Sequence, residues 1–240
     1  LTSVRVRQGT TRLPAAAVRV TTPDVGGGFG LKGITHPEML LVACAARMLG
    51  RPVRWIADRS ESMLADNGGR DLTSDLTLAF DADDRLRGYL VETVSNLGAY
   101  NGGFGQFIQT ELFSKVMTGA YDVPAACLSV RGVYTNTAPV DAYRGAGRPE
   151  AIFALERAMD HAARTLGVDP WEMRRRNFIR PDRFPYRTPS GVTYDHCDFA
   201  RLLDRARVEA DVAGFPARAA ATAARGKLRG MGLAYYIESI

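Results

Sequence analysis

The glycine-rich segment 26–33, followed by a proline at position 37, constrains the fold of this chain more than any other feature. Within it, Gly28-Phe29-Gly30-Leu31-Lys32-Gly33 matches the pattern G-x-G-x-x-G, which in dinucleotide-binding units joins a strand to a helix that begins inside the pattern. Pro37 would then lie within the first turns of that helix, where proline lacks an N–H donor and clashes with the preceding turn. The sequence therefore predicts that the helix begins at Pro37 and that the glycines form a loop before it.

A dinucleotide-binding module for NAD or FAD, using residues 28–33 and Asp58, is the alternative interpretation. A predicted strand at 16–22 precedes the glycines, and Asp58 ends the next predicted strand, near the place of a ribose-binding carboxylate. However, residues 16–22 alternate apolar and polar side chains, whereas a central parallel strand is apolar on both faces. The two interpretations predict different helix starts, at Gly30 or at Pro37.

Hydrophobic periodicity predicts an α+β fold in which mixed sheets pack against helices. Alternation with period two indicates strands, and spacing of three and four residues between glycine and proline signals indicates helices. The predicted strands are 16–22, 51–57, 71–80, 86–96, 128–134 and 231–237, with a hairpin turn at 81–84. The predicted helices are 37–49, 149–166, 169–178 and 199–212, and 211–227 is a linker or an exposed helix. Hairpins beside helices favour α+β over a doubly wound parallel sheet.

Composition argues against several classes of function. The 240 residues carry a net charge of +5, but the arginines are spread along the chain and form no basic stripe typical of nucleic-acid binding. Three cysteines and three histidines are scattered without the spacing of a disulfide framework or a zinc site, so we expect no metal ligated directly by side chains. The sequence shows neither a membrane span nor a signal peptide, which predicts a cytoplasmic protein without membrane contact.

Two further loops share the small residues of the first. Residues 138–150, APVDAYRGAGRPE, place Arg144 and Arg148 on either side of a Gly-Ala-Gly turn, which suits a phosphate, a carboxylate or a polar cofactor oxygen. Residues 96–106, NLGAYNGGFGQ, repeat the combination of glycine and aromatic residues. Each loop alone could be a structural turn. Because backbone without side chains can approach a rigid ligand closely, we expect all three to converge on one large polar cofactor.

In the order GGGFG, H-P-E at the helix start, RPVRWIADRSESM and APVDAYRGAGRPEA, the chain resembles the large subunits of the molybdenum hydroxylases. This family comprises xanthine dehydrogenase, aldehyde oxidase and aerobic carbon monoxide dehydrogenase. The resemblance runs from about residue 17 to residue 240 and implies a fold like the first molybdenum-cofactor-binding domain of that subunit. It further implies that residues 1–240 are a fragment comprising this domain, with 211–240 leading toward a second cofactor-binding domain.

The resemblance also implies a cofactor, partners and an activity. The implied cofactor is molybdenum bound to molybdopterin, in its cytosine dinucleotide form. The implied partners are an iron–sulfur subunit, an FAD subunit, the remainder of the large subunit and a small-molecule substrate. The implied activity is that of an oxidoreductase that hydroxylates an aldehyde or an N-heteroaromatic carbon with oxygen from water, and its electrons pass through the pterin to Fe–S and FAD. In such an enzyme the protein contributes positioning and electrostatics.

The resemblance assigns contacts residue by residue. It places cofactor contacts at Gly27, Gly28, Phe29, Gly30, Arg144, Gly145 and Ala146, and substrate-facing side chains at Tyr143 and Gln106. From the residues alone, Tyr143 could equally pack in the core, and Gln106 could bond only its own turn. No catalytic residue is assigned, because the family's glutamate would lie beyond Ile240 and Glu238 comes too early.

Departures from the family pattern bear on the substrate. Gly145 stands where carbon monoxide dehydrogenases carry the cysteine that bridges molybdenum to copper, so the resemblance is to their copper-free relatives. Gly33, Leu112 and Ala146 stand where the xanthine enzymes place three purine-binding residues. We therefore expect neither carbon monoxide nor purine as the substrate. We also expect the isolated fragment neither to retain molybdenum tightly nor to turn over.

Overall fold

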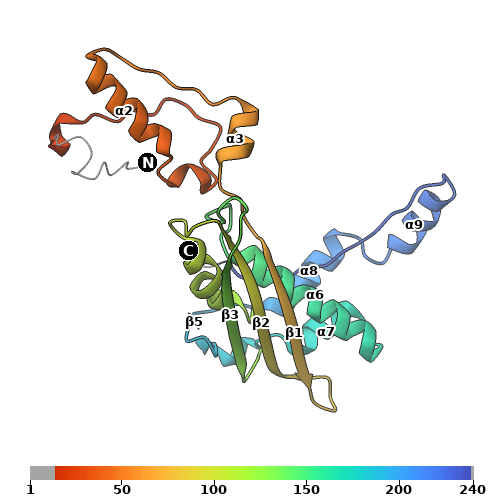
Figure 1. The fold of residues 1–240 in the computed structure, drawn as a ribbon. Coiled ribbons are helices and arrows are strands. Elements are labelled where there is room, and N and C mark those ends of the chain that lie inside the picture. The colour runs from red at the N-terminus through yellow and green to blue at the C-terminus, as the bar shows by residue number, and fades with distance from the viewer. Residues whose placement is uncertain (1–13, 239–240) are drawn as a thin grey trace. The chain divides into compact units, whose positions relative to one another are not determined.

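The computed structural model describes residues 14–238, which divide into two compact units (Figure 1). The loop unit comprises residues up to 71 together with 96–108 and 133–146. The sheet unit comprises residues 72–95, 109–132 and those from 147 onward. Helices and sheets of mixed size make up the chain, so the predicted α+β class is confirmed.

The sheet unit is built on three strands in the order β1-β2-β3. Strand β1 (Leu72–Phe80) pairs antiparallel with β2 (Leu86–Gly98), and β3 (Ala126–Tyr134) lies on the other side of β2. Side chains of β1 alternate between half-buried and exposed, as expected for a strand with one covered face. The hairpin turn is closed by the Asp81 carboxylate, which accepts hydrogen bonds from the backbone N–H groups of Asp83 and Arg85.

Helices cover one face of this sheet and supply most of its core. They are α5 (Phe113–Val116), α6 (Arg148–Leu166), α7 (Pro170–Asn177) and α8 (Phe199–Glu209). Helix α9 (Phe215–Ala223) follows α8 and extends away from the sheet in Figure 1, and none of its residues belongs to the core cluster. The smaller elements are a π-helical turn η3 (Ile108–Leu112), η4 (Pro181–Arg183), and a two-stranded ribbon of β4 (Tyr186–Arg187) and β5 (Thr193–Tyr194). Leu86 and Val91 of β2 pack in one cluster with Leu155 and Met159 of α6, which lies behind the sheet in Figure 1.

An ionic cluster lies inside this core. Arg174 of α7 is fully buried, and its Nε lies 2.9 Å from Oε2 of Glu156 on α6. Glu156 also accepts hydrogen bonds from the Tyr121 hydroxyl and from the Tyr235 backbone N–H, the latter at 2.8 Å. Burial raises the pKa of Glu156, although Arg174 and the hydrogen bonds that Glu156 accepts act to lower it. The cluster therefore links α6, α7 and the segment around Tyr235. The Arg174 cation and the Glu156 carboxylate are both buried, so each depends on the other for its opposite charge.

The loop unit contains helices but little buried hydrocarbon. Its elements are η1 (Ala15–Ala17), η2 (Leu31–Gly33), α2 (Pro37–Leu49), α3 (Arg59–Ala65) and α4 (Gly105–Phe107). Helix α2 begins at Pro37 and ends before Gly50, whose φ of 62° is the left-handed conformation that glycine adopts without strain. Neither α2 nor α3 has a buried residue among those described.

Three predicted strands are absent, and this corrects the sequence analysis. Residues 18–22, 51–57 and 231–237 form no strand, and 15–17 form a 3-10 turn. A period-two pattern gives an extended segment only when a neighbouring strand accepts its backbone hydrogen bonds, and none does so here among residues 14–238. Segment 231–237 is held instead by side chains, since Arg174 donates to the Leu233 carbonyl and Glu156 accepts from Tyr235. Residues 211–227 contain α9, in agreement with the exposed-helix option.

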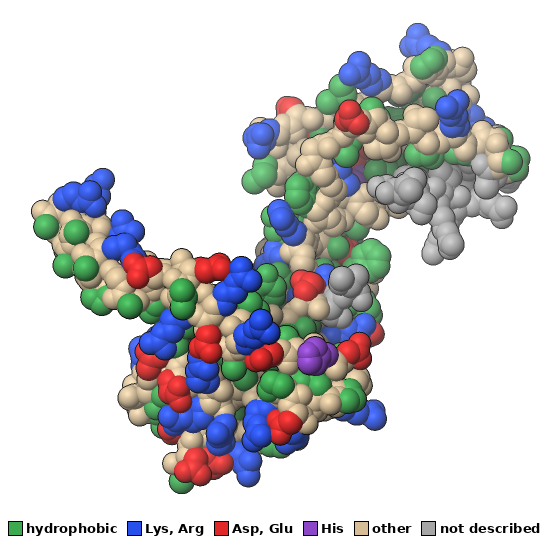
Figure 2. All heavy atoms as spheres, turned by 180° about the vertical axis from the view of Figure 1, so that it is seen from behind, with side chains coloured by type: hydrophobic (Ala, Val, Ile, Leu, Met, Phe, Trp, Pro, Cys, Tyr) green, Lys and Arg blue, Asp and Glu red, His purple; other side chains and the backbone are tan. Residues whose placement is uncertain are grey.

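The described residues bear on two functions that the composition argues against, membrane insertion and nucleic-acid binding. No helix within residues 14–238 is long and apolar enough to cross a membrane. Figure 2 shows Asp and Glu side chains interspersed among Lys and Arg side chains on the face that it draws. This mixed distribution differs from the basic stripe of a nucleic-acid-binding surface.

Candidate functional site

The start of helix α2 decides between the two interpretations of the glycine loop. Helix α2 begins at Pro37 with His36 as its N-cap, only the 3-10 turn η2 lies between Gly30 and His36, and no strand precedes the glycines within residues 14–26. The Asp58 carboxylate accepts the backbone N–H of Glu61 at 2.8 Å in a capping box of α3. The dinucleotide interpretation is therefore wrong. The strand that it requires before the glycines and the helix start that it requires at Gly30 are both absent from residues 14–36, and Asp58 is the N-cap of α3.

The glycine loop (residues 26–33) lies in direct contact with the turn at residues 143–146, the Arg144 turn, within the loop unit. The backbone N–H of Arg144 donates to the carbonyl of Phe29 at 2.9 Å. A Cβ on Gly30 would lie 2.8 Å from the carbonyl oxygen of Ala142, and Gly30 has a φ of 92°, so only glycine fits there. The guanidinium carbon of Arg144 lies 5.7 Å from the centroid of the Phe29 ring.

The third loop, residues 96–106, contacts Asp141, which lies just before the Arg144 turn, so the three loops form one assembly. The Asp141 side chain is 3% exposed, and its carboxylate accepts hydrogen bonds from the backbone N–H groups of Gly103 at 2.5 Å and Phe104 at 3.0 Å. The expected convergence of the three loops is thus found in the structure. Sequence reasoning did not single out Asp141, because nothing local to residue 141 indicates a contact with residue 103.

The donor groups of this assembly are available to a ligand. No residue among 14–238 accepts a hydrogen bond from the backbone N–H groups of 26–30. Phe29 is 49% exposed, and within the described part of the chain no carboxylate or carbonyl oxygen accepts a hydrogen bond from the exposed Arg144 guanidinium. Free N–H groups next to an unpaired cation suit an anionic or oxygen-rich ligand.

The other predicted site residues lie on the Arg144 turn and in α4. Gly145 and Ala146 have φ values of 91° and 37°, and Ala146 N–H donates to the Tyr143 carbonyl at 2.8 Å, which closes a tight turn. Tyr143 is 48% exposed, and the Arg70 guanidinium lies 4.7 Å from its ring centroid, so Tyr143 is no core residue. Gln106 lies exposed in α4, two residues beyond Phe104.

Two cavities lie in the loop unit beside this assembly. One, of about 640 Å³, is lined by residues that include Leu31, Asp58, Asn67 and Tyr143. The other, of about 690 Å³, is lined by residues of segments 33–38 and 100–104 together with Asp141. Gly28 and Arg144 line neither cavity, and they present their donors on an exposed surface instead.

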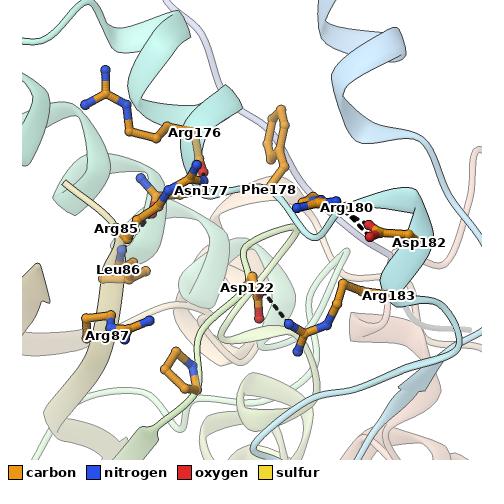
Figure 3. A pocket seen from close by; sticks show the side chains of 11 residues that line it. Arg85, Leu86, Arg87, Asp122, Arg176, Asn177, Phe178, Arg180, Asp182 and Arg183 are labelled. Atoms are coloured by element: carbon orange, nitrogen blue, oxygen red, sulfur yellow. Dashed lines mark hydrogen bonds and ion pairs between the residues drawn. The ribbon is translucent and has the colours of Figure 1, made fainter. Parts of the chain in front are cut away.

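An arginine-lined pocket of about 350 Å³ lies in the sheet unit (Figure 3). Its guanidinium groups have partners within the chain: Arg176 lies 2.6 Å from Asp84, Arg180 2.8 Å from Asp182, and Arg183 3.5 Å from Asp122. Arg85 donates to the Arg176 carbonyl at the end of α7. These contacts fasten the β1–β2 turn and the segment after α7, so the pocket needs no ligand to explain its charges.

Comparison with known proteins gives consistent matches along the chain. Residues 4–178 match the molybdopterin cofactor-binding domain family. The carbon monoxide dehydrogenase large chain of Hydrogenophaga pseudoflava is 36% identical over 236 residues, which is 95% of this chain and 29% of that protein. The nicotine 6-hydroxylase large subunit of Paenarthrobacter nicotinovorans is 34% identical over 223 residues, 92% of this chain and 27% of that protein.

A solved structure agrees with these matches. Quinoline 2-oxidoreductase from Pseudomonas putida 86 superposes with a TM-score of 0.79 at 38% identity, over 85% of this chain and 26% of that chain. The chain therefore spans less than a third of the length of each of these relatives.

Proposed function

Because the chain belongs to the molybdopterin cofactor-binding domains of the molybdenum hydroxylase large subunits, we propose that its three convergent loops hold a molybdenum–molybdopterin cofactor. The observation that carries this proposal is the junction of the glycine loop with the Arg144 turn, formed by the hydrogen bond from Arg144 N–H to Phe29 O. Without that junction the two predicted sets of cofactor contacts would belong to separate surfaces.

The residues present fit such a cofactor. A molybdopterin offers phosphate and ring oxygens together with a metal–oxo end, and all of these accept hydrogen bonds. The N–H groups of residues 26–30 have no acceptor within the described chain, and a Cβ on Gly28 would meet nothing nearer than Lys32 Cβ at 4.0 Å. Side-chain-free backbone with unused donors is the arrangement that a rigid, anionic group requires.

Each group of residues has its own task in this proposal. The N–H groups of Gly27, Gly28, Phe29 and Gly30 would hold the metal-bearing end of the cofactor. Arg144 offers a planar pair of donors to phosphate or pterin oxygens, supported by the Gly145-Ala146 turn. Tyr143 and Gln106 face the substrate. When bound, the cofactor would supply the two-electron redox chemistry for hydroxylating a carbon, while the protein binds and orients the cofactor.

We propose that the whole enzyme is a multi-subunit oxidoreductase, in which residues 1–240 comprise the first cofactor-binding domain and residues 211–240 lead toward a second one. Its electrons pass to iron–sulfur clusters and FAD on partner subunits, its pterin is the cytosine dinucleotide form, and it works in the cytoplasm. The substrate is an aldehyde or an N-heteroaromatic compound. The names of relatives that act on nicotine and quinoline support the second class, and Gly145 offers no thiolate for copper.

The substitution Gly28→Ala tests the cofactor site separately from folding. The added methyl has space within the chain and Gly28 does not have a positive φ, so the stability of the protein should not change. If the Gly28 backbone lies against the cofactor, the methyl should reduce the molybdenum and pterin retained by the complete large subunit. Gly230→Ala, where a Cβ also meets nothing within 4 Å, is the matched control.

The measurement is metal analysis and pterin release on the large subunit purified with its partner subunits. We expect the wild type and Gly230→Ala to contain equal molybdenum, and Gly28→Ala to contain several-fold less at an unchanged melting temperature. A wild-type complex free of molybdenum would refute the proposed function. Equal loading of all three proteins would refute the assigned position of the cofactor.

A further inference from the structure

We propose that Asp141 is a positioning residue that fixes the substrate-side turn, defined as residues 102–106, against the Arg144 turn. This inference rests on the proposed function, because it takes Tyr143 and Gln106 as the side chains that face the substrate. It goes further in assigning to the buried Asp141 carboxylate the control of where the Gln106 side chain lies.

The contacts of Asp141 with the substrate-side turn are made to backbone alone. Its Oδ2 accepts from Gly103 N–H at 2.5 Å, and its Oδ1 accepts from Phe104 N–H at 3.0 Å. Phe104 is the N-cap of α4, and its own side chain makes no capping hydrogen bond. Asp141 therefore supplies, from a distant part of the sequence, an acceptor at the beginning of the turn that carries Gln106.

Asp141 is itself held in place on its own side of the junction. Its Oδ1 also accepts from Ala142 N–H at 2.7 Å, and its backbone N–H donates to the Gly68 carbonyl at 3.0 Å. At 3% exposure, the carboxylate has little access to water that could replace these partners. The position of the substrate-side turn is thus fixed relative to the Arg144 turn, which begins at the next residues.

The glycine at position 102 gives independent evidence of a close fit. A Cβ there would lie 2.2 Å from Oδ2 and 2.9 Å from Cγ of Asp141, too close for any side chain. The neighbouring Gly103 differs, because its Cβ would lie 3.6 Å from the same oxygen, an ordinary contact distance. Neither glycine has a positive φ, so the space taken by Asp141, and not backbone strain, requires glycine at 102.

This geometry separates two tasks within four residues. The Asp141 side chain holds the substrate-side turn, while the Ala142 carbonyl and the Arg144 N–H contact the glycine loop at Gly30 and Phe29. The hydrogen bond from Arg144 N–H to Phe29 O does not involve the Asp141 carboxylate, so a change confined to this carboxylate should displace the substrate-side turn and leave that hydrogen bond in place. We expect weaker substrate binding with normal cofactor content.

Two substitutions disturb the same contact from opposite sides. Asp141→Asn keeps the shape but turns an acceptor into an NH₂ donor, which faces either the Gly103 N–H or the N–H groups of Phe104 and Ala142. Gly102→Ala keeps the carboxylate and pushes it away. Both are made in the complete large subunit with its partner subunits, and Gly230→Ala, which lies in the sheet unit and has space for a Cβ, serves as the control.

Hydrogen–deuterium exchange of the cofactor-free protein is the first readout, because it needs neither substrate nor turnover. We expect the peptide containing Gly103 and Phe104 to exchange on the order of tenfold faster in Asp141→Asn and Gly102→Ala, since its N–H groups lose their acceptor. A peptide that reports on Arg144 but not on Ala142, whose N–H also donates to Asp141, should exchange as in the wild type. Gly103→Ala, which keeps its N–H and its distance from Asp141, should leave exchange of the 100–107 peptide unchanged.

Steady-state kinetics per bound molybdenum is the second readout, with quinoline and benzaldehyde as the probe substrates. Both disturbing variants should raise KM on the order of tenfold with a smaller effect on kcat, at wild-type molybdenum content. Unchanged KM and unchanged exchange in a complex that contains molybdenum would overturn this inference and leave the proposed function standing. Loss of molybdenum in proportion to loss of activity would do the same. A wild-type complex without molybdenum would overturn the proposed function, and this inference with it.

Discussion

Replacing Arg174 with methionine should destabilise the sheet unit more than any neighbouring charge substitution. The guanidinium is fully buried, with its Nε 2.9 Å from Glu156 and an Nη 2.9 Å from Asp160. Methionine fills much of the same space but leaves the Glu156 carboxylate, 5% exposed, without its cation. Breaking a buried pair by removing one partner costs about 3–5 kcal/mol.

The melting temperature measures this cost. At roughly 2–4 °C per kcal/mol for a chain of this size, Arg174→Met should lower the melting temperature by roughly 6–20 °C. Arg175→Met is the matched control, because Arg175 is the next residue of α7 but pairs with Asp204 at an exposed position. An exposed pair contributes at most about 1 kcal/mol, so this control should melt within a few degrees of the wild type.

The pH dependence gives a second check, whose sign follows from Glu156. Burial raises the pKa of this carboxyl, and removing Arg174 takes away the charge that lowers it most, so its pKa should rise further. A carboxyl with a raised pKa in the folded state binds its proton more tightly there, so stability falls as the pH rises toward that pKa. The penalty of Arg174→Met should therefore be largest near pH 8 and shrink toward pH 5.

Thermal unfolding followed by circular dichroism from pH 5 to pH 8 provides both numbers. The reasoning fails if Arg174→Met and Arg175→Met lower the melting temperature equally. It also fails if the difference between them grows as the pH falls.

Two further substitutions test contacts elsewhere in the chain. Gly30→Ala should lower the free energy of unfolding by about 1–3 kcal/mol and speed hydrogen exchange at Arg144, because a Cβ at φ 92° would collide with the Ala142 carbonyl. Gly33→Ala is the control: its Cβ meets nothing within 4 Å, so its free energy of unfolding should stay within about 0.5 kcal/mol of the wild type. Asn177→Ala removes the partner of the buried Leu86 N–H at 2.7 Å and of the half-buried Asp84 carbonyl at 3.0 Å. At about 1–3 kcal/mol for a buried group left unpaired, the Leu86 N–H alone should lower the free energy of unfolding by this amount, which urea denaturation measures.

The helices could be predicted from sequence because their ends are decided locally. Pro37 at the first turn and Gly50 in the left-handed conformation mark the limits of α2, and Gly167, with a φ of 69°, marks the end of α6. The Asp169 carboxylate accepts the N–H groups of Trp171 and Glu172, so this N-cap was also predictable. Such signals act within a few residues and need no knowledge of the rest of the fold.

The three absent strands and Asp141 could not be predicted in this way, because they depend on distant partners. An alternating segment such as 51–57 becomes a strand only if another strand lies beside it. Asp141 looks like any loop aspartate until the backbone near Gly103 is placed against it. The convergence of the loops was predictable only because repeated glycines beside aromatic residues suggested a common ligand.

The compact arrangement of residues 141–144 has a consequence for how such a protein can change over time. The backbone of Phe104 is anchored while its ring is 49% exposed, so the side chain at this position can be exchanged without loosening the anchor. If residues 102–106 face the substrate as proposed, variation at Phe104 would alter which compounds bind, while the glycine loop and the Arg144 turn would be kept. A fold of this kind can change the side chain that meets the substrate one residue at a time, while the backbone that carries it keeps its hydrogen bond to Asp141.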